Sequence, residues 1–157
     1  MPDPPAADVA LIAHVGYDIE AIGPFVGAME STARRLCIAV LMEWPPAAVA
    51  DPFWPIVHGE ARLALPALPE FVELLRALGR EPTVTMTERA ARHFDGRAQL
   101  EGFLRRQLWI ADGGEKERRF REALEELAVE GPDGTFSLAG QEASSIGMAL
   151  SGSPISR

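Results

Sequence analysis

Cysteine and histidine are scarce in this sequence. Cys37 is the only cysteine among 157 residues, which excludes an intrachain disulfide. It lies within an apolar run, where a cysteine usually packs as a small buried hydrophobic residue. The three histidines are far apart in the sequence and form no zinc-ligand pattern with Cys37. We therefore predict that Cys37 is buried and that the chain holds no metal.

Basic residues are outnumbered as well. Lys and Arg total 15 against 23 Asp and Glu, and the net charge is −8. This balance counts against a nucleic-acid partner and against anionic membrane surfaces, because both rely on clustered Lys and Arg. No apolar run reaches the ~18–20 residues of a membrane span, and the first residues lack the pattern of a signal peptide. We expect a cytoplasmic protein.

Standard catalytic motifs are missing too. The sequence contains no Gly-x-Gly-x-x-Gly loop, no P-loop and no Gly-x-Ser-x-Gly elbow, so no catalytic residue is assigned. With 47% hydrophobic residues, the chain has the composition of a globular protein. Its length predicts one domain over residues 1–157, with a core at 7–87, a helical insertion at 97–129 and a C-terminal strand region at 135–150.

The stretch from residue 7 to 42 carries the clearest fold signal. Two apolar runs without polar alternation, residues 9–15 and 36–42, flank a segment of helical periodicity. Pro24 suits the first turn of that helix, since its missing N–H has no intrahelical partner to lose. Such a pattern is typical of a βαβ unit whose strands are buried on both faces.

The rest of the chain continues this pattern with one interruption. Residues 43–66 are rich in proline and carry Trp44, Phe53 and Trp54, which indicates a long loop at the C-terminal end of a strand. Such a loop is either functional or a lid over one end of the core. A helix at 68–78, closed by Gly79, and a strand at 83–87 follow. The order predicts an α/β fold with a doubly wound, mostly parallel sheet.

Two helices and a weak strand complete the prediction. The helices are expected at residues 97–110 and 115–129, a turn at 131–134 and the strand at 144–150. The pairs Glu117/Arg121 and Arg118/Glu122 are four residues apart and are expected on the solvent side of the second helix.

Two histidines are candidate site residues. His14 falls where the first strand ends, beside Val15 and Tyr17, and open α/β sheets bind ligands outside the C-terminal ends of their strands. The alternative is a histidine satisfied by the backbone at a strand end. His58 and Glu60 could form an acid–base pair, or could be surface neighbours by chance.

Residues 7–19, Ala-Asp-Val-Ala-Leu-Ile-Ala-His-Val-Gly-Tyr-Asp-Ile, resemble the fourth-strand segment of class I S-adenosylmethionine-dependent methyltransferases. In that family a helix, a fifth strand, an acceptor-side insertion, a helix and a sixth strand follow. An antiparallel seventh strand, for which residues 144–150 are the candidate, lies between the fifth and sixth. The resemblance implies a Rossmann-like fold, S-adenosyl-L-methionine as cofactor and a small-molecule methyl acceptor. It implies cofactor contacts at Ala13, His14, Val15 and Tyr17. Trp44, Trp54 and His58, in the segment that stands in the place of the acceptor-side insertion, are our candidate substrate contacts.

The family's best-defined cofactor motifs have no counterpart in this sequence. Neither its Gly-rich first loop nor the acidic residue that holds the cofactor ribose is present. The chain therefore resembles the C-terminal half of such an enzyme, and we expect it to be unable to bind cofactor or catalyse alone. An alternative is a non-catalytic interaction module that uses an exposed strand edge and the aromatic loop 44–57. A winged-helix-like module at residues 97–138 is a third interpretation, disfavoured by its acidic setting.

The resemblance also has a physical consequence for the first strand. With the family's first three strands missing, residues 9–15 would form an apolar, uncharged sheet edge, which proteins normally avoid. Uncovering about four large side chains at ~1.5–3 kcal/mol each forfeits roughly 6–12 kcal/mol. Because a whole domain is stable by only ~5–15 kcal/mol, we predict that the chain is marginally stable or self-associates through this edge.

Overall fold

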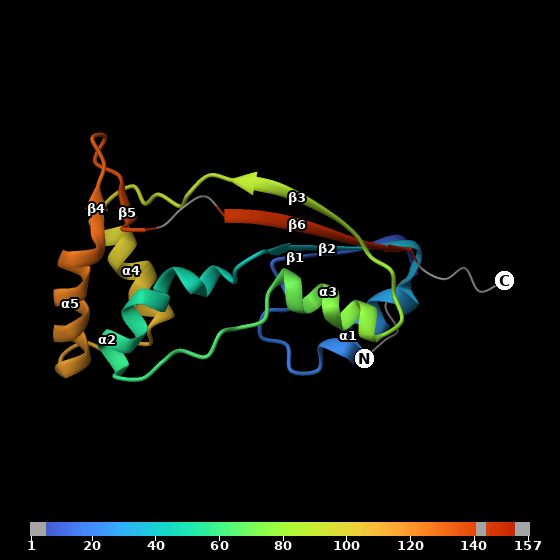
Figure 1. Cartoon of the computed structure of the whole chain (residues 1–157), viewed down its shortest axis with the longest axis horizontal. Coiled ribbons are helices and arrows are strands. Elements are labelled where there is room, and N and C mark those ends of the chain that lie inside the picture. Colours follow the sequence, from blue (N-terminus) through green and yellow to red (C-terminus); the bar gives the residue numbers. More distant parts are fainter. Residues whose placement is uncertain (1–5, 141–143, 153–157) are drawn as a thin grey trace. The chain divides into compact units, whose positions relative to one another are not determined.

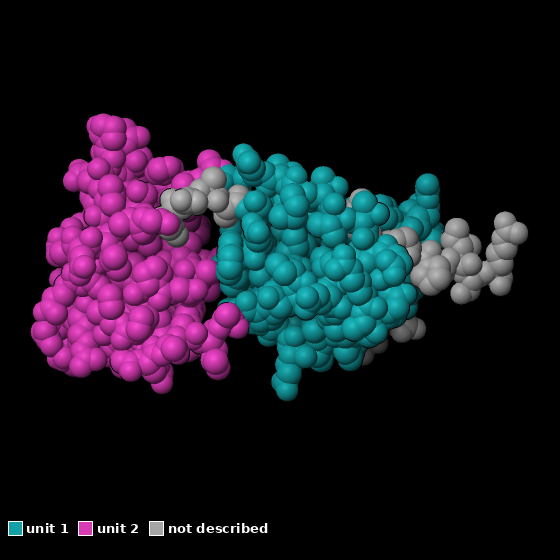
Figure 2. All heavy atoms as spheres, in the orientation of Figure 1, with its two compact units in different colours: residues 1–45, 65–89, 144–157 teal, residues 46–64, 90–143 magenta. Residues whose placement is uncertain are grey.

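The computed structural model describes residues 6–140 and 144–152. The chain divides into two compact units (Figure 2). Unit 1 comprises Met1–Pro45, Leu65–Arg89 and Ser144–Arg157, and unit 2 comprises Pro46–Ala64 and Ala90–Ala143. Within the described ranges, none of the helices has the length and apolar character needed to cross a membrane.

Unit 1 is built on a four-stranded sheet in the order β1-β2-β6-β3. The strands are β1 (Ala7–Ala13), β2 (Ala33–Met42), β6 (Ser144–Gly152) and β3 (Thr83–Arg89). The β1–β2 pair is parallel, whereas β6 runs antiparallel to both of its neighbours. The α/β class and the position of the last strand between its two neighbours are thus confirmed.

The sheet is mixed and not mostly parallel as the sequence predicts, because two of its three strand pairings are antiparallel. The reason lies at the start of β6. Ser144 is opposite Arg89 and Ile146 is opposite Met42, so β6 begins at the end of the sheet where β2 and β3 stop. A strand that starts at that end must run antiparallel to both neighbours.

Helices α1 (Ile22–Thr32) and α3 (Leu68–Ala77) lie on the same face of this sheet (Figure 1). Cys37, Ala39 and Leu41 of β2 are buried on that face. The helices cover it with Val26 of α1 and a row of apolar side chains of α3. This packing uses the helix face predicted at residues 68–78, and Gly79 follows α3 with a φ of 77°, as a helix-ending glycine does. The core residues are Tyr17, Val26, Ala39, Leu41, Ala67, Leu68, Phe71, Val72, Leu75 and Ala149.

The opposite face of the sheet carries apolar side chains that none of the described helices of unit 1 covers (Figure 1). Leu36, Ile38 and Val40 of β2 are half-buried there, and Leu11 of β1, aligned with Ile38, is 62% exposed. Among the residues that the structure describes, β2 is the only strand that pairs with β1, which is the edge position predicted for the first strand. The predicted burial of Cys37 is confirmed as well, because its side chain is on the helix-covered face.

The sequence predicts that the first strand ends at Val15, but β1 ends at Ala13. The backbone of His14 adopts a φ of 55°, which turns the chain out of the extended conformation directly after Ala13. Gly16 then adopts a φ of 114°, a value that side-chain-bearing residues rarely adopt. Val15 therefore belongs to the connection that leads to α1, and its side chain is exposed.

Unit 2 contains the proline-rich segment that the sequence predicts to be a loop. This segment folds into η1 (Pro46–Phe53), a 3₁₀ helix, and α2 (Trp54–His58). Phe53 is fully buried and Trp54 nearly so, because both belong to the core of unit 2. The aromatic residues at 53 and 54 thus build a core and do not form an exposed docking loop. Trp44, which belongs to unit 1, is the exposed aromatic residue of the predicted loop.

The other elements of unit 2 follow the prediction closely. They are α4 (Arg97–Gln107), α5 (Glu115–Leu127), β4 (Ala128–Glu130) and β5 (Phe136–Leu138). The rings of Phe53 and Phe120 pack with centroids 6.0 Å apart, which joins η1 to α5. The prediction of one domain over residues 1–157 stays a prediction, and residues 141–143 of the predicted strand region lie outside the described residues.

The two predicted ion pairs of α5 are confirmed, but one is less exposed than expected. Glu117 accepts hydrogen bonds from Arg121 at 2.7 Å, from Arg105 of α4 at 3.1 Å and from the N–H of Gly113. The Arg121 and Gly113 hydrogen bonds lower the pKa of Glu117 from 4.5 to about 2. Glu117 therefore connects α5 to α4 and to the preceding turn, in place of the solvent-facing position predicted for it.

Candidate functional site

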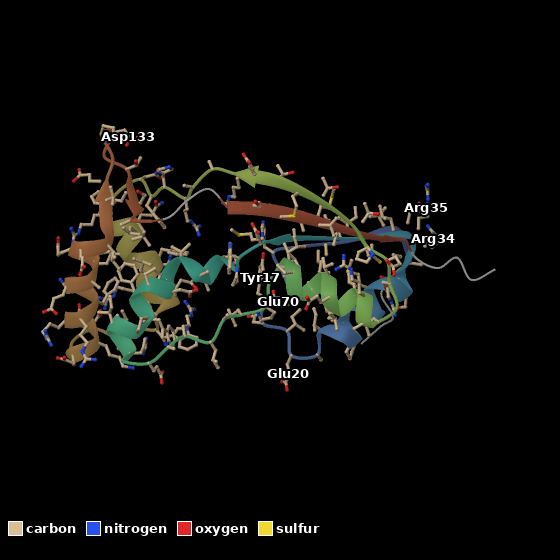
Figure 3. The ribbon with its side chains drawn as sticks, in the orientation of Figure 1. Tyr17, Glu20, Arg34, Arg35, Glu70 and Asp133 are labelled. Atoms are coloured by element: carbon tan, nitrogen blue, oxygen red, sulfur yellow. The ribbon has the colours of Figure 1, made fainter. Side chains whose placement is uncertain are left out.

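The C-terminal ends of β1 and β2 are joined by a small hydrogen-bond network around Tyr17. The backbone N–H of Met42 donates to the Tyr17 hydroxyl at 2.8 Å, and His14 Nδ1 lies 3.3 Å from the same oxygen. The His14 N–H donates to the Val40 carbonyl at 2.8 Å, which holds the turn after β1 against β2. Figure 3 shows Tyr17 at this end of the sheet, far from Arg34 and Arg35 at the other.

Tyr17 is the one residue of this network that belongs to the core. Its ring is 8% exposed and packs with the α1 and α3 side chains. Burial raises the pKa of the Tyr17 hydroxyl, and the hydrogen bond from Met42 opposes that shift. The hydroxyl thus stays protonated at neutral pH and positions the turn that carries His14.

His14 is exposed and has a strained backbone. A positive φ in a residue with a Cβ costs roughly 1–2 kcal/mol, and such outliers cluster at functional sites. In His14 the conformation is held by the N–H bond to Val40, while the imidazole edge reaches Tyr17. This geometry agrees with both interpretations of His14: a site residue, and a histidine held by backbone contacts at a strand end.

Two further side chains, those of Trp44 and Arg89, lie at the same end of the sheet. The Glu43 N–H donates to the Ser145 carbonyl at 2.9 Å, which fixes the chain as it leaves β2, and the indole of Trp44 is 66% exposed. At the end of β3, Arg89 Nη1 lies 3.8 Å from the Met42 sulfur. This end of the sheet thus carries the imidazole of His14, the indole of Trp44 and the guanidinium of Arg89. Such groups are suited to stack on planar ligands or to form hydrogen bonds with them.

The other predicted substrate residues belong to unit 2. His58 Nε2 donates to the Leu108 carbonyl at 3.0 Å, and its Nδ1 lies 3.0 Å from the Lys116 ammonium. Both ring nitrogens are therefore engaged, and neither is directed at Glu60 as the predicted acid–base pair requires. The rings of Trp54 and His58 stack with centroids 4.1 Å apart, and the Arg62 guanidinium lies 4.7 Å from the Trp54 ring centre.

Unit 2 also has features that the sequence did not reveal. A shallow pocket of about 430 Å³ is lined by Asp51, Pro55, Gly59, Glu60, Ala61, Arg62 and Ala64. Burial raises the pKa of Asp51, opposed by its ion pair with Arg62 at 3.1 Å. Trp109 follows α4 with a φ of 51°, in a position where glycine is usual, and its exposed ring meets Trp54 edge-on at 5.6 Å. The sequence signal that could have identified Trp109 is a tryptophan at the position after a helix where glycine is usual.

In unit 1, sequence reasoning found His14 and Tyr17 but missed Met42 and Arg89. The strand-end rule that singled out His14 applies equally to the predicted strand 36–42 and would have found Met42. It would not have found Arg89, because the third strand was predicted to end at residue 87, whereas β3 continues to Arg89. The absence of a bound metal stays a prediction. Within the ranges that the structure describes, no three His, Cys, Asp or Glu side chains are grouped as a metal site.

No protein-family model matches the chain. No curated protein matches it in a sequence search.

Proposed function

We propose that unit 1 corresponds to the C-terminal half of a class I S-adenosylmethionine-dependent methyltransferase fold. The observation that supports the proposal is the strand arrangement. Since β2 and β3 are both antiparallel to β6, the three strands β1, β2 and β3 run in one direction, with a single reversed strand between β2 and β3. The fourth to seventh strands of that family have the same order and the same single reversal.

In this proposal the end of the sheet that carries His14, Tyr17 and Trp44, at the C-terminal ends of β1 and β2, faces the cofactor. Ala13, His14 and Val15 supply the wall after the first strand, and Tyr17 holds that wall in place through Met42. When bound, the cofactor supplies a methyl group on a positively charged sulfur for transfer to a small-molecule acceptor. The exposed Trp44 indole is suited to contact either the adenine or the acceptor by stacking.

By itself, this chain has only part of a cofactor site. A nucleotide-type cofactor is held mainly by a Gly-rich loop at a helix N-terminus and by an acidic residue on its ribose. Neither is present among these residues, so the edge of unit 1 contributes only part of the contacts. We expect the isolated chain to bind the cofactor weakly and to transfer no methyl groups.

Calorimetric titration of the chain with S-adenosylmethionine tests this limit, with adenosine as the matched control ligand. We expect no saturable heat from either compound with a dissociation constant below about 1 mM, the value that corresponds to about −4.1 kcal/mol. Low-micromolar binding of S-adenosylmethionine, with none of adenosine, would contradict the claim that the site is incomplete.

A further inference from the structure

The outer edge of β1 has the properties of a pairing surface. In the described part of the chain β1 pairs with one strand, and its register with β2 is continuous from Val9 to Ala13. This stretch contains no charge, no proline and no bulge, which are the devices that normally prevent edge strands from pairing. The other outer strand, β3, carries three threonines and ends in Glu88 and Arg89. The two edges of the sheet are therefore not equivalent.

The backbone of β1 has a defined set of outward-facing groups. The His14 N–H donates to Val40 of β2, so the peptide groups on that side of β1 belong to the even-numbered residues. Successive residues of a strand direct their N–H and C=O groups to alternate sides. Val9, Leu11 and Ala13 thus direct theirs away from β2. Their side chains lie on the uncovered face of the sheet, where Val9 is 47% and Leu11 62% exposed.

We propose that β1 pairs with β1 of a second copy of this chain, antiparallel, with the twofold axis at Leu11. In this register Leu11 lies opposite its own counterpart and Val9 lies opposite Ala13 of the second copy. All three outward-facing residues then exchange backbone hydrogen bonds. The two four-stranded sheets join into one, which is within the size range of natural open sheets.

The regular part of β1 selects this register. Its pairing with β2 is continuous only from Val9 to Ala13, and an axis at Leu11 pairs all three outward-facing residues of that stretch with one another. Shifting the register by one residue would place outward-facing backbone groups opposite residues whose groups point toward β2, so these hydrogen bonds could not form. The inference does not rest on the proposed methyltransferase ancestry.

Size-exclusion chromatography with light scattering tests the pairing. We expect the 17.0 kDa chain to reach twice its mass at micromolar concentration. Leu11→Lys places two ammonium groups across the twofold axis and should yield a monomer. Thr85→Lys is the matched control, because Thr85 lies on the same sheet face at the other edge, and this variant should remain a dimer. A wild-type monomer, a dimeric Leu11→Lys variant or a monomeric Thr85→Lys variant would each overturn the proposal.

Amide hydrogen exchange resolved by residue distinguishes edge pairing from stacking of the uncovered faces. The amides of Ala10, Ile12 and His14 should be protected at all concentrations, since they face β2. Those of Val9, Leu11 and Ala13 should gain protection only as the chain dimerises, and should lose it in Leu11→Lys while the even-numbered amides keep theirs. A dimer in which Val9, Leu11 and Ala13 exchange as fast as in the monomer would refute pairing through β1.

Discussion

At the scale of single residues, Tyr17 links the ends of the two parallel strands. Its hydroxyl accepts the Met42 N–H, and its buried position raises its pKa. Tyr17 is also the only tyrosine in the chain, so the ultraviolet absorbance of tyrosinate reports on this residue alone. This makes the network of the candidate site directly measurable.

We predict that Tyr17 titrates at a higher pH in the folded chain than in denaturant. Because folding raises this pKa, the folded state holds the proton more tightly. The stability that this difference in pKa contributes is fully present below about pH 10, the ordinary pKa of tyrosine. It is lost as the pH rises through the pKa of Tyr17 in the folded chain. A tyrosinate transition at the same or lower pH in the native chain would contradict this assignment.

The variant Tyr17→Phe provides the companion measurement. It leaves the Met42 N–H without its acceptor and should cost about 1–3 kcal/mol at neutral pH, measured by urea unfolding. It should also abolish the alkaline absorbance change.

At the scale of elements, the contact between α3 and β6 depends on a residue without a side chain. A Cβ at Gly147 would lie 2.0 Å from Leu68 Cδ2 and 2.8 Å from the Met86 sulfur. We predict that Gly147→Ala destabilises the chain by about 1–3 kcal/mol, because α3 must move or Leu68 must leave its rotamer. Urea unfolding followed by circular dichroism measures the change.

Two variants control that experiment. Gly27→Ala in α1 adds a methyl group where no atom lies within 4 Å, and it should be neutral or stabilising by about 0.5–1 kcal/mol. Leu68→Ala relieves the clash, so the double variant Gly147→Ala/Leu68→Ala should lose less stability than the two single losses added together. Additive losses, or a Gly147→Ala variant as stable as Gly27→Ala, would show that the close approach is unimportant.

The elements themselves were largely predictable from local pattern. The face of α3 followed from periodicity, and its end at Gly79 followed from helix-ending chemistry. The edge position of β1 was expected from the family resemblance and not from local pattern. The end of β1 did not, because nothing in the sequence around His14 signals a positive φ in a residue with a Cβ. Strand-end chemistry found His14 and Tyr17, but the Met42 contact joins residues 25 apart and is invisible to local pattern.

At the scale of the whole molecule, unit 2 is formed by two insertions into unit 1, one after β2 and one after β3. The sequence predicts the second insertion as a helical elaboration but treats the first as a loop. The prolines of this segment are compatible only with short helices, and η1 and α2 are short. They could not show that Phe53 packs against Phe120, since this contact between distant residues depends on tertiary structure and not on local pattern.

The measurement that most directly tests the central claim is a titration with millimolar S-adenosylmethionine followed by backbone amide chemical shifts. We predict that shifts are confined to residues 13–17 and 42–44, at the C-terminal ends of β1 and β2, and that they saturate only weakly. Unchanged amides at these residues, or saturable shifts confined to the pocket of Asp51 and Arg62, would contradict the account.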